Sequence, residues 1–355
     1  MRDLILKLEK ERSLSKAEWM RLIGERTPES SAFLLERAQA VRHAFYGRSI
    51  YIRGLIEFTN HCKNDCYYCG IRCSNRSLSR YRMTEAEILS CCQNGYELGF
   101  RTFVLQGGED NWFTQERMTA LIAKIRHAFP DCAITLSVGE REREEYQAYF
   151  DAGADRFLLR HETAEEAHYR QLHPKGMELQ HRKECLWHLK EIGYQTGSGI
   201  MVGTPGQKTE HLAEDMLFLQ ELRPQMVGIG PFLPHKDTPF SGAQAGSLEL
   251  TLYLLGLVRL LLPTALIPAT TALSTLHPEG RRRGILAGAN VLMPNLSPVE
   301  NRKNYSLYDN KRCMDSEAAE GLFLLKEEMK EIGYEIVMDR GDAIAEGKAE
   351  RYESE

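Results

Sequence analysis

The sequence predicts an α/β fold, a complete (βα)8 TIM barrel that follows an N-terminal helical extension. Eight apolar runs with strand character recur along the chain, and segments with helical periodicity separate most of them. Strands that alternate with helices favour a parallel sheet, and eight such units favour closure into a barrel. An open dinucleotide-binding sheet is the alternative, but no G-x-G-x-x-G turn follows the first run.

Residues 1–49 are predicted to be helical. Ser15 and Glu18 have the spacing of a capping box, and Thr27 followed by Pro28 is typical of a helix start. We expect these helices to cap the lower end of the barrel, which spans 50–310. Residues 311–355 are expected to form a C-terminal helix and a polar tail, loose from 339 onward.

The predicted strands are the eight apolar runs. They span 55–59, 102–106, 133–138, 156–160, 197–202, 226–230, 266–271 and 290–293. Helical periodicity is clearest at 84–98, 110–129, 141–152 and 178–192. In such a barrel the active site lies at the carboxyl ends of the strands, so the residues that close each strand are the candidates for function.

Composition favours a cytoplasmic enzyme. The formal charge of the 355 residues is -5 with both signs mixed, which gives no basic face for nucleic acid. No run approaches the roughly 20 apolar residues of a membrane span, and the charged amino terminus lacks a signal-peptide core. The nine cysteines do not look like a disulfide framework. We therefore expect neither nucleic acid nor a membrane as partner.

Three cysteines, Cys62, Cys66 and Cys69, form a C-x3-C-x2-C triplet directly after the first strand. A cubane iron–sulfur cluster normally takes four thiolates, so three leave one iron open, and catalysis usually happens at an open metal position. A zinc knuckle with His61 or Cys73 as fourth ligand is the structural alternative. Cys73 would also be able to fill the open iron, but its irregular spacing favours a bystander.

Polar residues close the second and fourth strands. Gly107 and Gly108 would let a zwitterion approach the backbone, although an ordinary turn explains them equally. Residues 158–163 place four polar side chains at one rim, where Arg160 is able to clamp a carboxylate and Glu162 to hold an ammonium or a ribose hydroxyl. A surface salt bridge is the simpler reading. Arg182, in the next helix, is a further cation for a carboxylate.

The last two strands and the segment after them offer five more candidates. Thr270 and Thr271 are adjacent, so only one faces the barrel interior unless the strand ends or bulges there. Met293 is suited either to packing or to contact with an adenine. Tyr305 and Tyr308 lie three residues apart and are expected to fold over the mouth of the barrel.

The triplet, with Tyr68 before its last cysteine, resembles the radical S-adenosylmethionine (SAM) signature. More specific strings resemble the HydE-type maturases of FeFe-hydrogenase, in the biotin synthase-like part of that superfamily. They include Leu-Leu-Arg-His-Glu-Thr at 158–163 and lie at 80–83, 158–163, 226–232, 234–239, 267–272 and 293–295. The likeness runs from about residue 50 to about residue 310 and keeps the order of the motifs.

This resemblance implies one 4Fe-4S cluster whose open iron is chelated by SAM, and an electron from the cluster that splits SAM into methionine and a 5'-deoxyadenosyl radical. The implied substrate is a small cysteine-bound Fe(CO)2(CN) complex, converted into a diiron precursor. A sister radical SAM maturase would supply it, a GTPase scaffold maturase would receive the product, and ferredoxin or flavodoxin would donate the electron.

The resemblance also implies roles by position. The cluster ligands would be Cys62, Cys66 and Cys69. The residues around SAM would be Tyr68, Gly107, Gly108, Glu162, Arg182 and Met293. The catalytic substrate pocket would be lined by Arg160, Thr270, Thr271, Tyr305 and Tyr308.

One departure from the resemblance concerns a second cluster, which some members bind through a C-x7-C-x2-C set. Only Cys313 survives here, with Gly321 and Leu324 at the other positions, so no second iron–sulfur cluster is expected. A methylornithine synthase-like mutase is the first alternative. A biotin synthase-like sulfur inserter would need a second cluster, and the scattered cysteines elsewhere show no ligand spacing. A non-catalytic metal-binding chaperone, an alternative of another class, would not cleave SAM.

Overall fold

The computed structural model describes residues 1–311 and 318–344. Its centre is a six-stranded parallel sheet in which spatial order follows chain order. The strands are β2 (Gly54–Thr59), β3 (Thr102–Gly107), β4 (Ala133–Ser137), β5 (Arg156–Leu158), β6 (Gln195–Val202) and β7 (Met226–Pro231). Each of these contains or overlaps a predicted strand, and β5 ends two residues earlier than predicted.

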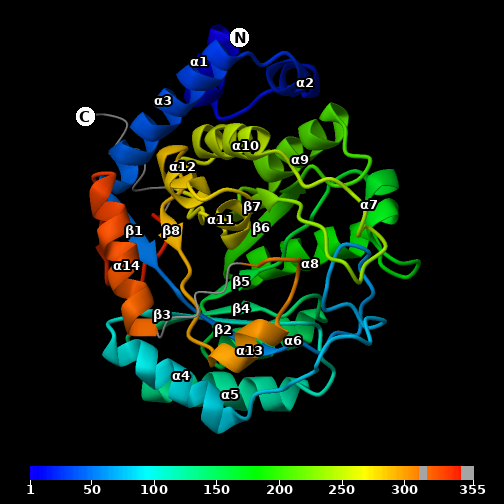
Figure 1. The fold of residues 1–355 in the computed structure, drawn as a ribbon, viewed down its shortest axis with the longest axis vertical. Helices are drawn as coiled ribbons and strands as arrows, with labels where there is room; N and C mark the ends of the chain where they lie inside the picture. The colour runs from blue at the N-terminus through cyan, green and yellow to red at the C-terminus, as the bar shows by residue number, and fades with distance from the viewer. Residues whose placement is uncertain (312–317, 345–355) are drawn as a thin grey trace.

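Three parallel bridges continue the ring beyond β7. Met226 bridges to Leu266, Pro268 bridges to Val291 of β8 (Val291–Leu292), and Asn295 returns to Leu55 of β2. The sheet therefore closes into the predicted barrel (Figure 1). The predicted strand 266–271 was wrong in extent. Pro268 has no N–H for a ladder, and the chain enters helix α11 (Thr271–Leu276) directly afterwards.

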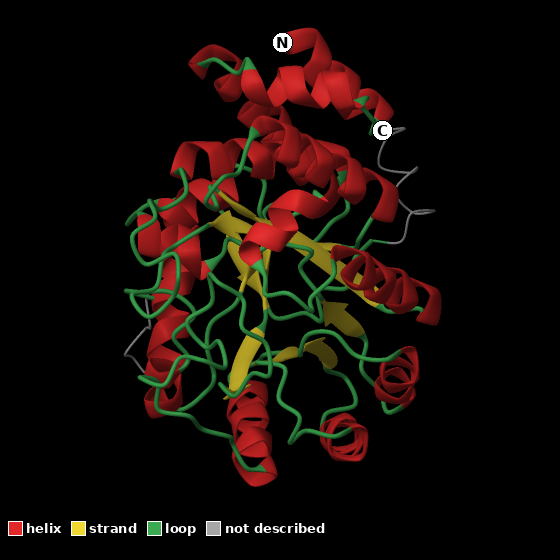
Figure 2. Ribbon diagram, turned by 90° about the vertical axis from the view of Figure 1, so that its right-hand side faces the viewer, coloured by secondary structure: helices red, strands yellow, loops and turns green. Residues whose placement is uncertain are grey.

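Helices lie around the strands, as Figure 2 shows. Their amphipathic faces supply the outer half of the core, including Ile122 and Ile125, which lie buried with Phe103 and Leu105 of β3. The first of them starts at a complete Thr84 and Glu87 capping box. They are α4 (Glu85–Glu97), α5 (Gln115–Ala128), α6 (Arg143–Asp151), α7 (Glu166–Leu172), α8 (Leu179–Ile192), α9 (Thr209–Leu222), α10 (Leu248–Leu261), α11, α12 (Gly280–Leu286) and α13 (Val299–Asn304). No helix among the described residues has both the length and the apolar character that a membrane span requires.

A second, smaller sheet extends the barrel wall. Strand β1 (Ser49–Ile52) precedes β2 and is separated from it by the buried Arg53. It pairs in parallel with β8 on one side and with β9 (Glu335–Val337) on the other. Helix α14 (Ala318–Glu331) leads into β9 and lies beside β1 in Figure 1. The pairing of β1 with β9 was not predicted.

The N-terminal helices are α1 (Arg2–Glu11), α2 (Lys16–Gly24) and α3 (Pro28–Tyr46). Both predicted helix starts are confirmed, because Ser15 and Thr27 each complete a capping box. Helix α2 packs on α9 and α3 packs on α10 (Figure 1). The amino ends of β3, β5 and β6 are covered by residues 339–344, so the expectation that the N-terminal helices cap that end was wrong.

An ion pair fixes residues 339–344 against the barrel floor, contrary to the prediction that the tail is loose from 339. Arg156 of β5 is fully buried, and its Nη2 lies 2.6 Å from Oδ1 of Asp342. The same guanidinium donates to Thr102 Oγ1 at 3.1 Å, and Gln195 donates to Asp342 at 2.7 Å. Burial alone would raise the pKa of Asp342, but the hydrogen bond from Gln195 and the charge of Arg156 outweigh it and lower the pKa.

We predict that Asp342→Asn lowers the free energy of unfolding by about 2 kcal/mol at pH 7, because it leaves the buried Arg156 without a carboxylate. The value is below that of a fully buried pair because the Asp342 side chain is 42% exposed and solvent screens it. A carboxylate with a lowered folded-state pKa stabilises above its unfolded pKa of about 3.9, so the difference should shrink as pH falls below that value. Urea unfolding of the full chain at pH 7 and pH 3.5 measures both effects.

Asp131→Asn is the matched control. The Arg101–Asp131 pair has side chains that are 29% and 48% exposed, so its loss should cost less than about 1 kcal/mol. Equal urea midpoints for Asp342→Asn and the wild-type protein at pH 7 would show that residues 339–344 are not held by this pair.

Candidate functional site

The candidate site lies where the carboxyl ends of β2, β3, β4 and β5 meet. The loop after β2, residues 60–75, carries the three cysteines of the triplet, and it is called the cysteine loop below. In Figure 1 this blue loop lies on the side of α7 and α8. The backbone N–H of Tyr67 in the loop donates to the carbonyl oxygen of Leu172, the last residue of α7, at 2.9 Å.

Side chains hold the cysteine loop in shape without any ligand. Arg72 makes two hydrogen bonds to the Asp65 carboxylate, at 2.7 and 2.5 Å. The backbone N–H of Cys73 closes the loop on the carbonyl of Asn64 at 2.9 Å. Arg80 donates to the carbonyl oxygens of Asn60, Ile71, Arg72 and Asn75. The loop is therefore preorganised, as a metal-binding loop requires.

The three cysteines of the triplet are free, and each residue as a whole is half-buried. Burial raises the pKa of Cys62 and of Cys66, and it raises that of Cys69 to about 12. Iron must therefore displace the thiol protons when it binds. No three His, Cys, Asp or Glu side chains in the described ranges stand close enough to share one metal ion. A cubane cluster binds each thiolate through a different iron, whereas a zinc knuckle gathers all its ligands around one metal ion.

The glycines at the end of β3 pack closely against their neighbours, Gly107 against β2 and Gly108 against the cysteine loop. A Cβ on Gly108 would lie 2.2 Å from the carbonyl oxygen of His61 and 2.7 Å from Cβ of Cys62. A Cβ on Gly107 would lie 2.7 Å from Cγ2 of Thr59. The absence of side chains is thus needed for the loop to sit on the strand. The predicted approach of a ligand to the same backbone stays a prediction.

Only two of the four polar side chains predicted at the end of the fourth strand share a contact at the rim. Arg160 Nη2 lies 3.1 Å from Glu162 Oε2, with side chains 29% and 11% exposed. His161 and Thr163 instead bind outer partners: His161 Nδ1 is 2.8 Å from Ser198 Oγ, and Thr163 bonds to the ring of a histidine in α7. The prediction that all four share the rim was wrong, because the side chains alternate between two faces.

Glu162 has a backbone φ of 64°, in the left-handed region that non-glycine residues rarely adopt. This conformation costs about 1–2 kcal/mol. Its N–H donates to the carbonyl of Gly199 in β6 at 3.0 Å, which helps to hold the strained residue. The carboxylate of this residue is the one that pairs with Arg160, and such strain is common at functional sites.

A second buried ion pair joins α8 to the end of β4. Arg182 Nε lies 2.7 Å from Glu140 Oε1, with side chains only 9% and 12% exposed. Burial opposes the charge of Arg182, but Tyr169 and Glu140 outweigh it and raise the pKa of the guanidinium. Glu109 extends the pair, since it accepts the backbone N–H of Glu140 at 3.0 Å. A carboxylate ligand at Arg182 would therefore share the guanidinium with Glu140.

Tyr68 is held by a histidine that sequence reasoning missed. Its hydroxyl lies 3.1 Å from Nε2 of His173, whose Nδ1 lies 3.0 Å from the carbonyl oxygen of Tyr169. Because Nδ1 must donate to a carbonyl, Nε2 accepts from the Tyr68 hydroxyl. Burial lowers the pKa of His173 to about 3, which keeps the ring neutral. Glu140 was detectable as the polar residue after the third predicted strand, whereas His173 carried no sequence signal.

The two predicted threonines are separated by the start of α11. Thr270 is the N-cap, and its Oγ1 would stand 2.8 Å from a Cβ on Gly230 of β7. This oxygen is buried without a hydrogen-bond partner among the described residues. Thr271 is the first helical residue. Thr270 therefore lies against the inner end of β7, and an unpaired buried hydroxyl there is suited to a polar ligand.

The last three candidates lie after β8. Met293 is partly buried and packs against the main core. Tyr305 is 2% exposed, and its hydroxyl lies 3.4 Å from Nε2 of Gln106 at the end of β3. Tyr308 is half-buried in the same segment. The structure thus brings Tyr305 to the rim, and the roles of all three stay predictions.

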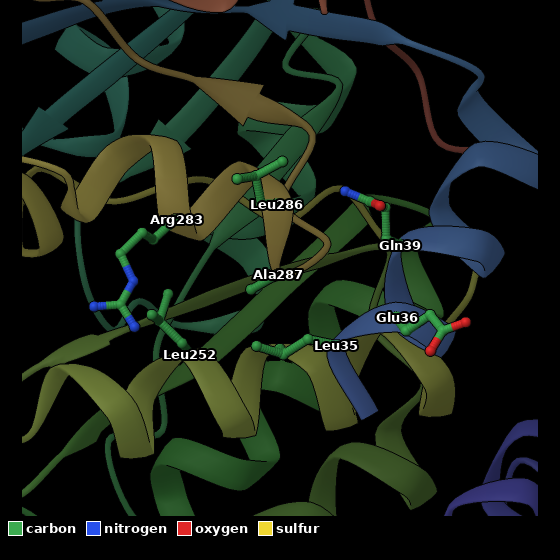
Figure 3. Close-up of a pocket in the computed structure, with 7 residues that line it drawn as sticks. All are labelled: Leu35, Glu36, Gln39, Leu252, Arg283, Leu286 and Ala287. Atoms are coloured by element: carbon green, nitrogen blue, oxygen red, sulfur yellow. The ribbon is translucent and has the colours of Figure 1, made fainter. Parts of the chain in front are cut away.

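Two cavities differ in their relation to this site. One of about 770 Å³ lies beside the cysteine loop, lined by Tyr67 and by residues 173–178, including Met177, whose Sδ is 3.7 Å from Cys66 Sγ. The other, of about 350 Å³, lies between α3, α10 and α12 (Figure 3). It contains none of the predicted site residues and is lined by Leu35, Glu36, Gln39, Leu252, Arg283, Leu286 and Ala287.

Comparison with known proteins gives relatives over most of the chain. Residues 56–219 match the Radical SAM superfamily. The chain is 45% identical over 281 residues to the [FeFe] hydrogenase maturase subunit HydE of Thermotoga maritima, which covers 79% of this chain and 80% of that protein. It is 28% identical to the 3-methylornithine synthase of Methanosarcina acetivorans, over 82% of this chain and 83% of that protein.

Solved structures share the fold. The crystal structure of methylornithine synthase (PylB) superposes with a TM-score of 0.82 at 24% identity and covers 98% of this chain and 99% of that chain. The crystal structure of HydG, a maturase of the [FeFe]-hydrogenase, gives a TM-score of 0.81 at 17% identity over 95% of this chain and 76% of that chain. At these identities the likeness concerns the fold alone, and it confirms the predicted barrel.

Proposed function

The chain belongs to the radical SAM superfamily and, within it, to the family of HydE maturases, and from this premise we propose that it helps to assemble the diiron subcluster of FeFe-hydrogenase. The observation that carries the proposal is the 45% identity to a HydE protein over four fifths of its length. As a radical SAM enzyme, the protein uses a 4Fe-4S cluster to cleave SAM reductively into methionine and a 5'-deoxyadenosyl radical.

We assign the cofactor site to the two rim ion pairs and the cysteine loop. Cys62, Cys66 and Cys69 would bind the cluster, since they are free thiols on a preorganised loop. Arg182 would supply the cation for the SAM carboxylate, and Glu162 would accept hydrogen bonds from an ammonium or a ribose hydroxyl. The remaining residues assigned around SAM are Tyr68, Gly107, Gly108 and Met293.

The substrate pocket is assigned to the residues deeper in the barrel. Thr270 Oγ1 and Arg160 Nε are buried polar atoms without hydrogen-bond partners among the described residues. Such atoms favour a ligand that accepts hydrogen bonds, and an anionic, cyanide-bearing cysteine–Fe(CO)2(CN) complex has that chemistry. Thr271, Tyr305 and Tyr308 complete the proposed lining.

The proposed partners follow from the family. A sister radical SAM maturase would deliver the iron complex, a GTPase scaffold would accept the diiron product, and ferredoxin or flavodoxin would supply electrons. We place the reaction in the cytoplasm, whose reducing conditions keep such thiols available for iron. A single cluster is proposed. Cys313, the remnant of a second cluster motif, lies outside the described residues.

The test uses anaerobically reconstituted, dithionite-reduced protein. We expect one 4Fe-4S signal in electron paramagnetic resonance that shifts when SAM is added, followed by formation of 5'-deoxyadenosine. With the other maturases and an apo-hydrogenase, omission of this protein should prevent the appearance of hydrogenase activity. Full activation without it would contradict the proposed maturase function, whereas a second cluster signal would contradict only the single-cluster proposal.

An amino-acid mutase is the second candidate, favoured by the 28% identity to a 3-methylornithine synthase. It predicts conversion of an amino acid into an isomer. The test incubates the protein with SAM, reductant and lysine and searches for 3-methylornithine by mass spectrometry. This measurement distinguishes the mutase from the maturase. Product at a stoichiometry close to that of 5'-deoxyadenosine would favour the mutase.

A further inference from the structure

We propose that Lys311 is a positioning residue for the substrate pocket, and that its ion pair with the buried Glu57 fastens residues 305–311 across the mouth of the barrel. These residues are called the mouth segment below. The inference rests on the proposed function in one respect, because the mouth segment carries Tyr305 and Tyr308, which are assigned to the pocket.

Glu57 is a carboxylate inside the barrel wall. Its side chain is 1% exposed, and it faces away from Ile56 and Phe58, which belong to the core beneath the outer helices. Both oxygens are paired: Oε1 accepts from Lys311 Nζ, and Oε2 accepts from Asn295 Nδ2 at 2.7 Å. The carboxylate therefore joins β2, the segment that follows β8 and the mouth segment at one point.

Lys311 contacts the proposed pocket lining as well as Glu57. Its Nζ donates to the carbonyl oxygen of Tyr305 at 3.0 Å and lies 4.9 Å from the centroid of the Tyr305 ring. The Tyr305 hydroxyl in turn lies 3.4 Å from Gln106 Nε2, and Gln106 is the register partner of Glu57 on β3. The ammonium thus fixes the backbone and the ring of Tyr305 against two neighbouring strands.

The rest of the mouth segment is tied to the cysteine loop and to the loop after β7. Gly70 donates its N–H to the carbonyl oxygen of Leu307 at 2.9 Å, and a Cβ on Gly70 would stand 2.1 Å from the carbonyl oxygen of Ser306. Asp309 donates its N–H to the carbonyl of Pro234 at 3.0 Å. Besides these backbone contacts, Lys311 extends a side chain that is only 11% exposed to the buried Glu57.

The energetics of the Lys311–Glu57 ion pair favour a role in positioning the mouth segment over a role in stabilising the protein. A buried ion pair rarely stabilises a protein more than an apolar pair of similar size would, because both charges lose their hydration. Loss of one partner is costly, because the other charge stays buried and uncompensated. The pair should therefore show coupling: removing both charges should disturb the mouth segment less than removing Lys311 alone.

The test compares Lys311→Met, Lys311→Arg and the double variant Glu57→Gln/Lys311→Met in the full-length, cluster-loaded protein. Hydrogen exchange read by mass spectrometry should show amides of residues 305–309 exchanging about tenfold faster in Lys311→Met, which corresponds to local opening. Lys311→Arg should restore most of the protection, and the double variant should be intermediate. Lys303→Met, which removes an exposed lysine from α13, should exchange like the wild type.

A second measurement links the mouth segment to the reaction. In Lys311→Met, the hydrogenase activity obtained per 5'-deoxyadenosine formed should fall about tenfold, because a displaced Tyr305 no longer orients the substrate. Wild-type exchange rates at 305–309 in Lys311→Met would overturn the proposal. Failure of the wild-type protein to activate hydrogenase would overturn the proposed function instead, while the exchange data would still decide the role of Lys311. If Lys311→Met does not fold, the other two variants decide. Exchange at wild-type rates in the double variant, together with faster exchange in Lys311→Arg than in the wild type, would also overturn the proposal.

Discussion

Replacing Cys66 by alanine is expected to abolish formation of 5'-deoxyadenosine while the barrel stays folded. The thiol is the middle member of the triplet, and its loss leaves two thiolates for a cluster that needs three from the loop. We expect the rate of 5'-deoxyadenosine formation to fall by at least about a thousandfold, because the cluster that cleaves SAM does not assemble. The fold should survive, because Arg72 and Arg80 hold the loop independently of the thiol.

Iron content, 5'-deoxyadenosine by chromatography and far-UV circular dichroism measure these effects together. Cys73→Ala is the matched control, since Cys73 is exposed and lies four positions beyond Cys69 in the same loop. It should keep both cluster and cleavage. Equal losses in Cys66→Ala and Cys73→Ala would make Cys73 a ligand and would contradict its assignment as a bystander.

Arg160→Ala is expected to separate SAM cleavage from substrate conversion. The guanidinium has a buried Nε without a hydrogen-bond partner among the described residues, beside its ion pair with Glu162. Loss of a charge-assisted hydrogen bond to the substrate should reduce hydrogenase activation about a hundredfold. Reductive SAM cleavage without substrate should fall less than about threefold, because Glu162 and Arg182, not Arg160, are assigned to SAM.

The measurement pairs a 5'-deoxyadenosine assay with a maturation assay on the same preparation. Arg170→Ala is the control, because Arg170 is 73% exposed and its carboxylate partner is Glu166, one turn earlier on α7. It should leave both assays close to wild type. An equal loss of the two activities in Arg160→Ala would mean that Arg160 acts through Glu162 on the cofactor, and the substrate assignment would be wrong.

The order of the barrel strands was predictable because each strand is an apolar run and each crossover is an amphipathic helix. The predicted extent of the seventh strand, 266–271, was wrong for a local reason. Pro268 has no backbone N–H to donate, and Thr270 is the N-cap of a helix. Strand β9 was missed because three residues give no periodic signal, and its partner β1 lies at the other end of the chain. A helix or strand is predictable from the sequence when it is long enough for its apolar residues to show a regular period.

The candidate site was predictable where residues follow a strand directly, as Arg160 and Glu162 do. Glu140 obeys the same rule, but it is the first of six consecutive charged residues, and nothing in that run singles it out. Lys311 was out of reach, since it stands 254 positions from Glu57 and only the packed barrel brings them together. Contacts of such sequence separation depend on tertiary structure and leave no local pattern.

Both openings of the barrel are covered by segments that follow its last strand. Residues 305–311 cross the mouth, and residues 339–344 seal the floor through Asp342 and Arg156. Ribosomes release a chain from its amino terminus, and domains begin to fold in that order. The ring of strands, from β2 to the return at Asn295, therefore leaves the ribosome before either covering segment does. In the order of synthesis, the segment that covers the mouth follows the ring of strands, and the segment that covers the floor comes after both.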